Sequence, residues 1–199
     1  MTGILIVRHG QSEWNAAGRW QGQEDPPLSS LGRAQATAAA ERVGTVDLVV
    51  ASDLQRAVET AATIAEAIGV GPVLIEPGLR ERHAGEWQGL TKAEIEEGWP
   101  GYIDAGDRPP GFEPTDTFSA RVHDALDRLE AAHRGATMLV VSHGGVVYII
   151  EEHHGLPFER VANLAGRHLT HHGPPRGVEL GERVDLVAEV DLSSVPTQL

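Results

Sequence analysis

The sequence predicts an α/β fold with three layers, in which a doubly wound, mostly parallel sheet carries helices on both faces. Short, continuously apolar and β-branched segments alternate along the chain with segments whose apolar residues recur every three or four positions. Continuous apolarity is typical of strands that are covered on both faces, as in a parallel sheet. The alternation of strand and helix is the pattern of a doubly wound sheet.

Four short apolar segments are predicted to form the interior of the sheet. They are "ILIV" at 4–7, "DLVVAS" at 47–52, "VLIEP" at 73–77 and "TMLVVSH" at 137–143. Near the end of the chain, residues 184–190 alternate between apolar and polar after Gly181-Glu182. This alternation predicts an edge strand or hairpin with one face in solvent. Such a strand could pair with a second copy, so a homo-oligomer is left open.

Four helices are predicted between these strands. The clearest begins just after Ser52, because Ser52 and Gln55 resemble a capping box, and it ends at Gly69. The other three run from Ser29 or Ser30 to about Val43, from about 116 to 133, and from Gly145 to Gly155.

Length and composition predict one soluble domain over residues 1–199. The proline- and glycine-rich stretches read as loops inside it, and we find no internal repeat. No apolar run is long enough for a membrane span and no cationic leader is evident, so we expect a cytoplasmic protein. The chain has no cysteine, which excludes disulfides and thiolate sites. Its net charge of −13 argues against nucleic-acid and anionic-membrane partners, although not against a small anionic ligand.

Charged and titratable residues follow the carboxyl ends of the predicted strands. In doubly wound sheets, ligands bind beyond these ends, so the residues are expected to converge on one rim. The rim residues are Arg8, His9, Arg56, Glu81, His143, Gly144 and Gly145.

This set of residues suits phosphoryl transfer without a metal ion. Arginine forks match phosphate oxygens, and a histidine supplies a nucleophile. A glutamate supplies an acid–base group, while glycines after the histidines let the backbone approach an anion. The arginines are also expected to lower the pKa of His9 and keep it neutral. No GxxxxGK[ST] loop for nucleotide phosphates is present.

Five motifs together resemble the histidine phosphatase superfamily, which includes the cofactor-dependent phosphoglycerate mutases and many phosphatases. They are "LIVRHGQSEWN", "GRWQGQEDPPLSSLGRAQA", "ASDLQRAVETA", "LRERHAGEWQGLT" and "VVSHGGVV", in the family's order and covering about residues 4 to 160. The resemblance implies a phosphoglycerate mutase-like fold. It also implies a metal-independent phosphatase of the histidine acid type that needs no cofactor.

The same resemblance implies a role for each site residue. His9 would attack phosphorus and become phosphorylated, and Glu81 would protonate the leaving oxygen and later activate water. The groups that would hold the phosphoryl oxygens are Arg8, Arg56 and His143, with further phosphate contacts from Ser12, Asn15, Gln21, Gly22 and Gly144.

Departures from the family's mutases favour hydrolysis of a small phosphorylated metabolite. Mutases are typically longer between the glutamate and the second histidine, whereas 61 residues separate Glu81 from His143 here. The mutase-like motif also has a tyrosine where this chain has Ala84. A phosphoglycerate mutase is the alternative, and a catalytically inactive phosphate- or phosphopeptide-binding module is a weaker one.

The pocket lining departs from the wider family as well. Phe112 and Pro114 replace a glycine and a serine around Glu113, and Tyr148 stands where an arginine is frequent. These changes predict an altered substrate pocket with one cation fewer and more aromatic surface.

The other histidines are predicted to have surface or packing roles rather than to bind a metal ion. They include His153 and His154, and a second group at His168, His171 and His172. Adjacent side chains point to different sides of a helix or a strand, so neither adjacent pair chelates readily.

Overall fold

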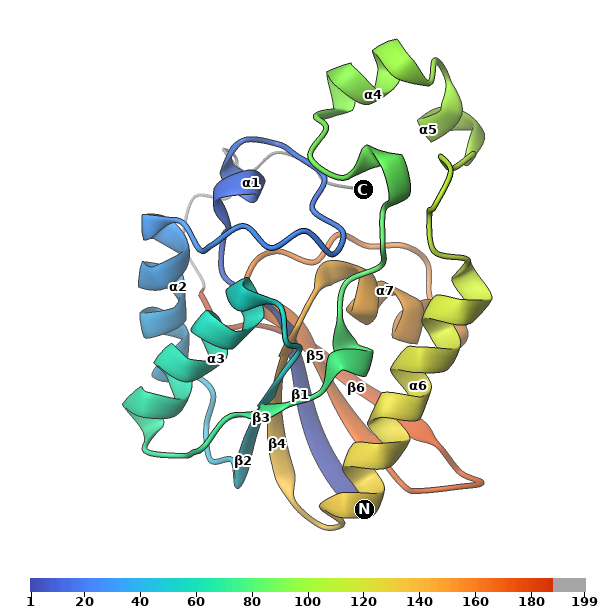
Figure 1. The fold of residues 1–199 in the computed structure, drawn as a ribbon. Coiled ribbons are helices and arrows are strands. Elements are labelled where there is room, and N and C mark those ends of the chain that lie inside the picture. The colour runs from blue at the N-terminus through green and yellow to red at the C-terminus, as the bar shows by residue number, and fades with distance from the viewer. Residues whose placement is uncertain (188–199) are drawn as a thin grey trace.

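The computed structural model describes residues 1–187, and its core is one sheet of six strands in the order β3-β2-β4-β1-β5-β6 (Figure 1). The strands are β1 (Thr2–Arg8), β2 (Leu48–Ala51), β3 (Leu74–Ile75), β4 (Thr137–Ser142), β5 (Ala165–His171) and β6 (Val178–Asp185). The first four are mutually parallel. Strand β5 pairs antiparallel with β1, and β6 pairs antiparallel with β5. The predicted mostly parallel sheet is therefore confirmed.

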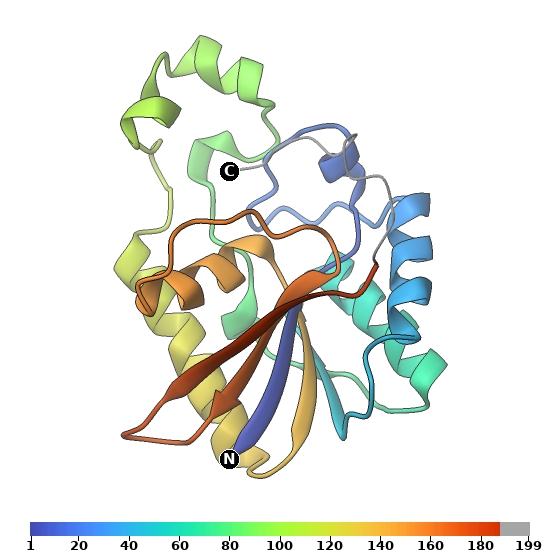
Figure 2. The same ribbon diagram turned by 180° about the vertical axis from the view of Figure 1, so that it is seen from behind.

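Helices cover both faces of this sheet. Helices α2 (Ser30–Ala40) and α3 (Gln55–Ile68) pack on one face, and α6 (Thr115–Ala132) and α7 (Gly144–His153) pack on the other (Figures 1 and 2). Alternate residues of β1 point into the two layers. Ile4 and Ile6 belong to the core under α6 and α7, whereas Leu5 and Val7 belong to the core under α2 and α3.

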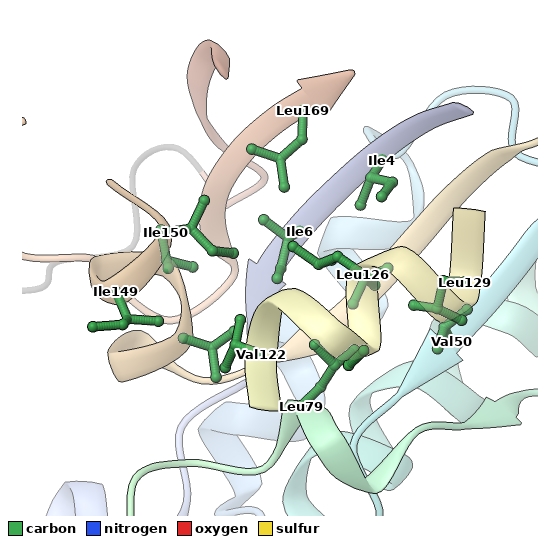
Figure 3. Packing of buried hydrophobic residues seen from close by; sticks show 14 of the residues in the cluster. Ile4, Ile6, Val50, Leu79, Val122, Leu126, Leu129, Ile149, Ile150 and Leu169 are labelled. Atoms are coloured by element: carbon green, nitrogen blue, oxygen red, sulfur yellow. The ribbon is translucent and has the colours of Figure 1, made fainter. Parts of the chain in front are cut away.

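The core under α6 and α7 joins strands and helices that are distant in sequence. Figure 3 shows Ile4 and Ile6 of β1 beside Leu126 of α6, with Leu169 of β5 on one side. Val140 of β4 is fully buried in the same cluster. This packing holds the carboxyl end of β1 in a fixed position relative to α6 and α7.

Short helices and irregular segments lie beyond the carboxyl ends of the parallel strands. They are α1 (Glu13–Ala16), α4 (Lys92–Gly98), α5 (Tyr102–Ala105) and the 3₁₀ turns Pro77–Leu79 and Gly85–Trp87. In Figure 1, α4 and α5 lie farthest from the sheet. A small apolar cluster around the fully buried Trp87 and Ile95 holds this region together.

The sequence analysis missed or misplaced several elements. It did not predict α1, α4, α5 or β5. It placed the last strand at 184–190, whereas β6 ends at Asp185 and residues 188–190 lie outside the described residues. The predicted strand at 73–77 is reduced to the two residues of β3.

The predicted capping box at Ser52 is wrong. The N-cap of α3 is Leu54, and it makes no side-chain cap hydrogen bond. The Ser52 hydroxyl is instead 2.7 Å from Nε2 of His143. The end of this helix is as predicted, because Gly69 adopts a left-handed φ of 70° at the C-cap.

No helix within the described 187 residues has both the length and the apolar character needed to cross a bilayer.

The loop that follows β1 packs directly against the first turn of α2. A Cβ added to Gly32 would lie 2.0 Å from the carbonyl oxygen of Gln11. We therefore expect Gly32→Ala to lower the free energy of unfolding by about 2 kcal/mol, the usual cost of overpacking. Gly98→Ala is the control, because nothing lies within 4 Å of that Cβ. Denaturant unfolding measures both, and equal stability of the two variants would contradict the close packing.

Candidate active site

The predicted rim residues meet around a cavity of about 380 Å³ beyond the carboxyl ends of β1, β2 and β4, and all of them except His143 line it. Arg8 is the last residue of β1, and His9 follows it. Arg56 lies in the first turn of α3, and Glu81 follows the 3₁₀ turn after β3. Arg8, His9 and Arg56 are thus positioned by an end of the sheet or of a helix, whereas Glu81 lies in an irregular segment.

Hydrogen bonds fix the tautomer of His9. Its Nδ1 lies 2.6 Å from the carbonyl oxygen of Gly10, which can only accept, so Nδ1 carries the proton. Its Nε2 then accepts a hydrogen bond from Nε of Arg56 at 3.2 Å. The lone pair of Nε2 is therefore the nucleophilic electron pair of this imidazole.

The two site arginines are buried without an anionic partner. Arg8 is 7% exposed and donates to the carbonyl of Val161, while Arg56 is 0% exposed. Arg56 donates to the carbonyls of Gly22 at 2.8 Å and Glu24 at 2.6 Å. Neither arginine makes an ion pair with any residue that the structure describes. Buried cations are normally paired, so this site can accept an anion.

Burial also shifts the pKa values of the arginines. It is the main cause that lowers the pKa of Arg8, and it lowers the pKa of Arg56 to about 10. A guanidinium with a pKa near this value is still charged at neutral pH. Both side chains are therefore available to neutralise phosphate oxygens.

Both site histidines are held in their neutral form. Burial is the largest cause that lowers the pKa of His9 well below its usual value, followed by the charges of Arg56 and Arg8. The predicted effect of the arginines is real, but it is secondary to desolvation. The pKa of His143 is lowered well below its usual value too, again mainly by burial.

His143 lies directly against His9 rather than on the cavity wall. The two rings meet edge to face, with centroids 5.2 Å apart. Nδ1 of His143 is buried and has no hydrogen-bond partner in the described part of the chain. When the Ser52 hydroxyl donates to Nε2, the imidazole proton is on Nδ1, and this unpartnered N–H can donate to an anion.

Two backbone N–H groups fix the carboxylate of Glu81. Oε1 accepts from the backbone of Arg82 at 2.7 Å, and Oε2 accepts from the backbone of Gly145 at 3.0 Å. A Cβ at Gly145 would lie 2.1 Å from Oε1 of Glu81. A glycine at 145 therefore lets the carboxylate approach the first turn of α7.

Arg121 of α6 holds the backbone of the segment that carries Glu81, a feature that the sequence analysis missed. Its Nη1 donates to the carbonyls of Gly78 at 2.9 Å and Arg80 at 2.7 Å. Its Nη2 donates to the carbonyl of Glu81 at 2.9 Å. Nε and Nη2 also bind both carboxylate oxygens of Glu113, at 2.7 and 2.8 Å. All five N–H groups are thus used, and three hold the residues around Glu81.

Glu113 completes this arrangement. Besides pairing with Arg121, its Oε2 accepts from the backbone N–H of His83 at 3.1 Å. The sequence assigned no role to Glu113 beyond its place between the two departures from the family at Phe112 and Pro114. The contact with Arg121 was not visible in the sequence, because the helical periodicity of α6 marks Arg121 only as a polar position.

The predicted phosphate contacts divide into two groups. Gln21, Gly22 and Gly144 line the cavity. Ser12 and Asn15 form a reciprocal capping box at α1, and among the described residues they do not belong to the cavity wall. Their role as phosphate contacts stays a prediction.

The outer part of the cavity is formed by residues that were given no catalytic or phosphate-binding role from the sequence, although Phe112 and Tyr148 were predicted to alter the pocket lining. They come mainly from the 82–118 region, from α7 and from the segment after it. They are Trp20, Arg82, Arg108, Phe112, Thr115, Phe118, Tyr148, Ile149, Glu152 and Phe158.

The remaining histidines take part in packing and hydrogen bonding. His171 is buried, with its Nε2 2.8 Å from Oδ1 of Asp127, and Nε2 of His172 lies 2.9 Å from Oε2 of Glu179. His154 lies within hydrogen-bond distance of two backbone carbonyls. Within residues 1–187, no group of three or more side chains of metal-binding type is suitably arranged.

Comparison with known proteins gives the same assignment as the geometry. The model of the histidine phosphatase superfamily (branch 1) matches residues 4–172. A protein named metal-independent phosphoserine phosphatase, from Arabidopsis thaliana, is 41% identical over 160 residues, which cover 75% of this chain and 67% of that relative. A glucosyl-3-phosphoglycerate phosphatase of Mycobacterium tuberculosis is 40% identical over 159 residues, which cover 72% of this chain and 71% of the relative.

Solved structures agree with this relationship. The mycobacterial glucosyl-3-phosphoglycerate phosphatase in complex with VO3 superimposes with a TM-score of 0.81 at 32% identity, covering 90% of this chain and 96% of that one. The fold, the rim residues and the sequence relationship lead to one assignment. The chain belongs to the histidine phosphatase superfamily, branch 1.

Proposed function

We propose that the protein is a phosphomonoesterase that hydrolyses small phosphorylated metabolites through a phosphohistidine at His9, with Glu81 as general acid and base. The observation that carries this proposal is the pair of buried, unpaired guanidiniums beside a neutral imidazole lone pair. A phosphate monoester supplies both the missing anion and the electrophile at this place.

The first step transfers the phosphoryl group to His9. Nε2 of His9 attacks phosphorus, and the bond from phosphorus to the ester oxygen breaks on the opposite side. Arg8 and Arg56 bind the equatorial oxygens and absorb their charge in the transition state, with His143 as a further donor. Arg56 gives up its bond to Nε2 as the new N–P bond forms. The proton of Glu81 goes to the leaving oxygen, and an alcohol departs.

The second step returns the enzyme to its starting state. The carboxylate of Glu81 takes a proton from water, and the oxygen of that water attacks phosphorus. The N–P bond breaks, its electron pair returns to Nε2, and inorganic phosphate leaves. One ester and one water are consumed, and one alcohol and one phosphate are released, so no metal or redox partner is needed.

Hydrolysis is favoured over mutase chemistry by two independent points. The interval between Glu81 and His143 is short for a mutase. The relatives named above are phosphatases, one for phosphoserine and one for glucosyl-3-phosphoglycerate. Another relative is named phosphoglycerate mutase-like protein 4, so the mutase reaction is the alternative to be tested.

Removal of the nucleophile and removal of the acid are expected to have different effects. His9→Ala should abolish phosphate release from all esters. Glu81→Gln should slow an alkyl ester such as phosphoserine by about 100-fold or more, the usual worth of a general acid. The same substitution should slow phosphoryl transfer from p-nitrophenyl phosphate to His9 far less, because that leaving group needs no proton. Single-turnover phosphate transfer with both substrates measures the difference, and equal losses would contradict Glu81 as the acid.

Three parallel assays distinguish the candidate functions. Phosphate release from p-nitrophenyl phosphate that persists in EDTA supports the proposal. Isomerisation of 3-phosphoglycerate with 2,3-bisphosphoglycerate, without net phosphate release, supports the mutase. Tight phosphate binding with no turnover supports an inactive binding module.

The neutral state of His9 has a consequence for stability. In the unfolded chain, a histidine takes up a proton near pH 6.5. In the folded protein His9 stays neutral at this pH, because its pKa is lowered well below that value. The unfolded state therefore binds more protons, and stability is lost as pH falls below about 6.5. Between pH 7.5 and pH 5.5, the free energy of unfolding measured with denaturant should fall by about 1 kcal/mol more in the parent protein than in His9→Gln. An equal loss in both would contradict a neutral His9.

Arg121 is expected to act on Glu81 rather than on the phosphate. Arg121→Met should reduce kcat for phosphoserine by about tenfold or more, since a displaced acid loses its alignment. The loss for p-nitrophenyl phosphate should be much smaller. Arg128→Met is the control, because Arg128 lies on the same helix, is exposed, and pairs with Glu76 rather than with the backbone around Glu81. If Arg121 had a merely structural role, the substitution would reduce kcat equally for both substrates and would lower the thermal midpoint of unfolding.

A further inference from the structure

The outer part of the cavity contains two arginines that also lack an anionic partner. Arg82 donates to the carbonyl of Glu113 at 2.7 Å and to the hydroxyl of Thr115 at 2.8 Å. Arg108 donates to the carbonyl of Asp107 at 2.7 Å. Neither makes an ion pair with any residue between positions 1 and 187.

The ring of Phe112 brings these two cations together. The guanidinium carbon of Arg82 lies 4.8 Å from the ring centroid, and that of Arg108 lies 5.3 Å from it. Burial is the main cause that lowers the pKa of Arg82, and the charge of Arg108 lowers it further. The two like charges therefore lie close enough to interact, and an anion placed between them would relieve this repulsion.

An aromatic pair contributes to the same cavity from α7 and the segment after it. The rings of Tyr148 and Phe158 lie 4.7 Å apart. The Tyr148 hydroxyl accepts from the backbone of Val161 at 2.9 Å, so this ring is fixed in place. Phe158 is 61% exposed at the cavity, which is unusual for so large an apolar side chain. These rings offer an apolar surface to the body of a ligand.

The balance of charges in this outer region suits a monoanion. Arg82 and Arg108 contribute two positive charges, and Glu152 adds one carboxylate to the same cavity. Glu152 interacts with Arg82 electrostatically, without forming an ion pair with it. One positive charge is left in excess, which matches a carboxylate better than a phosphate dianion. The planar forks of arginine also suit a carboxylate.

We propose that Arg82 and Arg108 bind a carboxylate on the leaving group of the substrate, whose apolar body lies along Tyr148 and Phe158. The substrates would then be phosphomonoesters of acids with an apolar or ring-containing body. This inference rests on the proposed function, because the phosphate is taken to lie at His9. Tyr148 stands where related sequences frequently have an arginine, and Arg82 and Arg108 supply the cationic surface from another wall.

Two pairs of matched probes test the outer site. Binding is measured by calorimetry with 4-(phosphonomethyl)benzoate and its neutral amide, 4-(phosphonomethyl)benzamide, neither of which can be hydrolysed. Turnover is measured with 4-carboxyphenyl phosphate and its amide, 4-carbamoylphenyl phosphate. In each pair the ratio of acid to amide reports the carboxylate alone, because the phosphorus group and the ring are shared.

The acid-to-amide ratio is expected to fall about tenfold in Arg82→Gln and in Arg108→Gln, the range for a charge-assisted hydrogen bond. Arg176→Gln is the control, because this exposed arginine lies in the turn between β5 and β6, away from the cavity. Glu152→Gln should change the ratio in the opposite direction, raising it about threefold as a like charge is removed. Comparing ratios between variants cancels the difference between the two leaving groups.

Phe158→Ala tests the apolar wall separately. It should weaken the acid and the amide phosphonate equally, by about fivefold, while leaving their ratio unchanged. Unchanged binding of both probes in this variant would overturn the apolar part of the proposal.

The outcomes also separate this inference from the proposed function. A ratio that is the same in the parent protein, Arg82→Gln and Arg108→Gln would overturn the carboxylate site. Equal loss of both probes in the arginine variants would overturn it too, since that result means a structural role. Binding that follows the expected ratio without any hydrolysis would support the carboxylate site and contradict the phosphomonoesterase.

Discussion

The site depends on the burial of two guanidinium groups beside His9 without a carboxylate to neutralise them. Removing a cation from water costs several kcal/mol, and the backbone carbonyls that bind Arg8 and Arg56 offset only part of that cost. The remaining positive potential has two effects. It attracts an anion, and it adds to the desolvation that lowers the pKa of His9. The same burial therefore prepares a site for an anion and keeps the His9 imidazole neutral, and the proposed phosphoryl transfer requires both.

Such a cluster needs a rigid support, and the backbone provides most of it. The loop with His9 is fixed by the contact between Gln11 and Gly32 and by the hydrogen bond from Asn163 to the carbonyl of His9. The segment with Glu81 lacks a long strand, since β3 has only two residues. Arg121 compensates by binding three carbonyl groups of that segment, those of Gly78, Arg80 and Glu81. It also pairs with the carboxylate of Glu113. Irregular backbone held by one partly buried arginine thus takes the place of regular strand pairing.

The inner site could be predicted from the sequence because its residues follow continuous apolar strands, whose carboxyl ends meet in any parallel sheet. Arg8, His9 and His143 are direct cases. Strand β5 escaped prediction because "AGRHLTH" has polar residues throughout and gains its place only by pairing with β1. The Ser52 hydroxyl could either cap α3 or bind His143, and the sequence indicated only the local cap. Contacts such as that of Arg121 with Glu81 join residues 40 positions apart and have no local signal.

The inner and outer parts of the cavity differ in what their geometry must achieve. Arg8, His9 and His143 lie at strand ends. Arg56 lies in the first turn of α3, and the carboxylate of Glu81 is held by backbone N–H groups. Such fixed positions suit the proposed phosphoryl transfer, whose in-line arrangement would be spoiled by errors of about 1 Å. The outer residues lie on connecting segments, on the first turn of α6 and on α7, where charge and apolar surface matter more than exact position. Binding energy gained at Arg82 and Arg108 can assist the reaction only if the phosphorus lies in line with Nε2 of His9 at the same time. With a carboxylate bound as proposed, the distance between the two anionic groups of a substrate would be the quantity that this cavity selects.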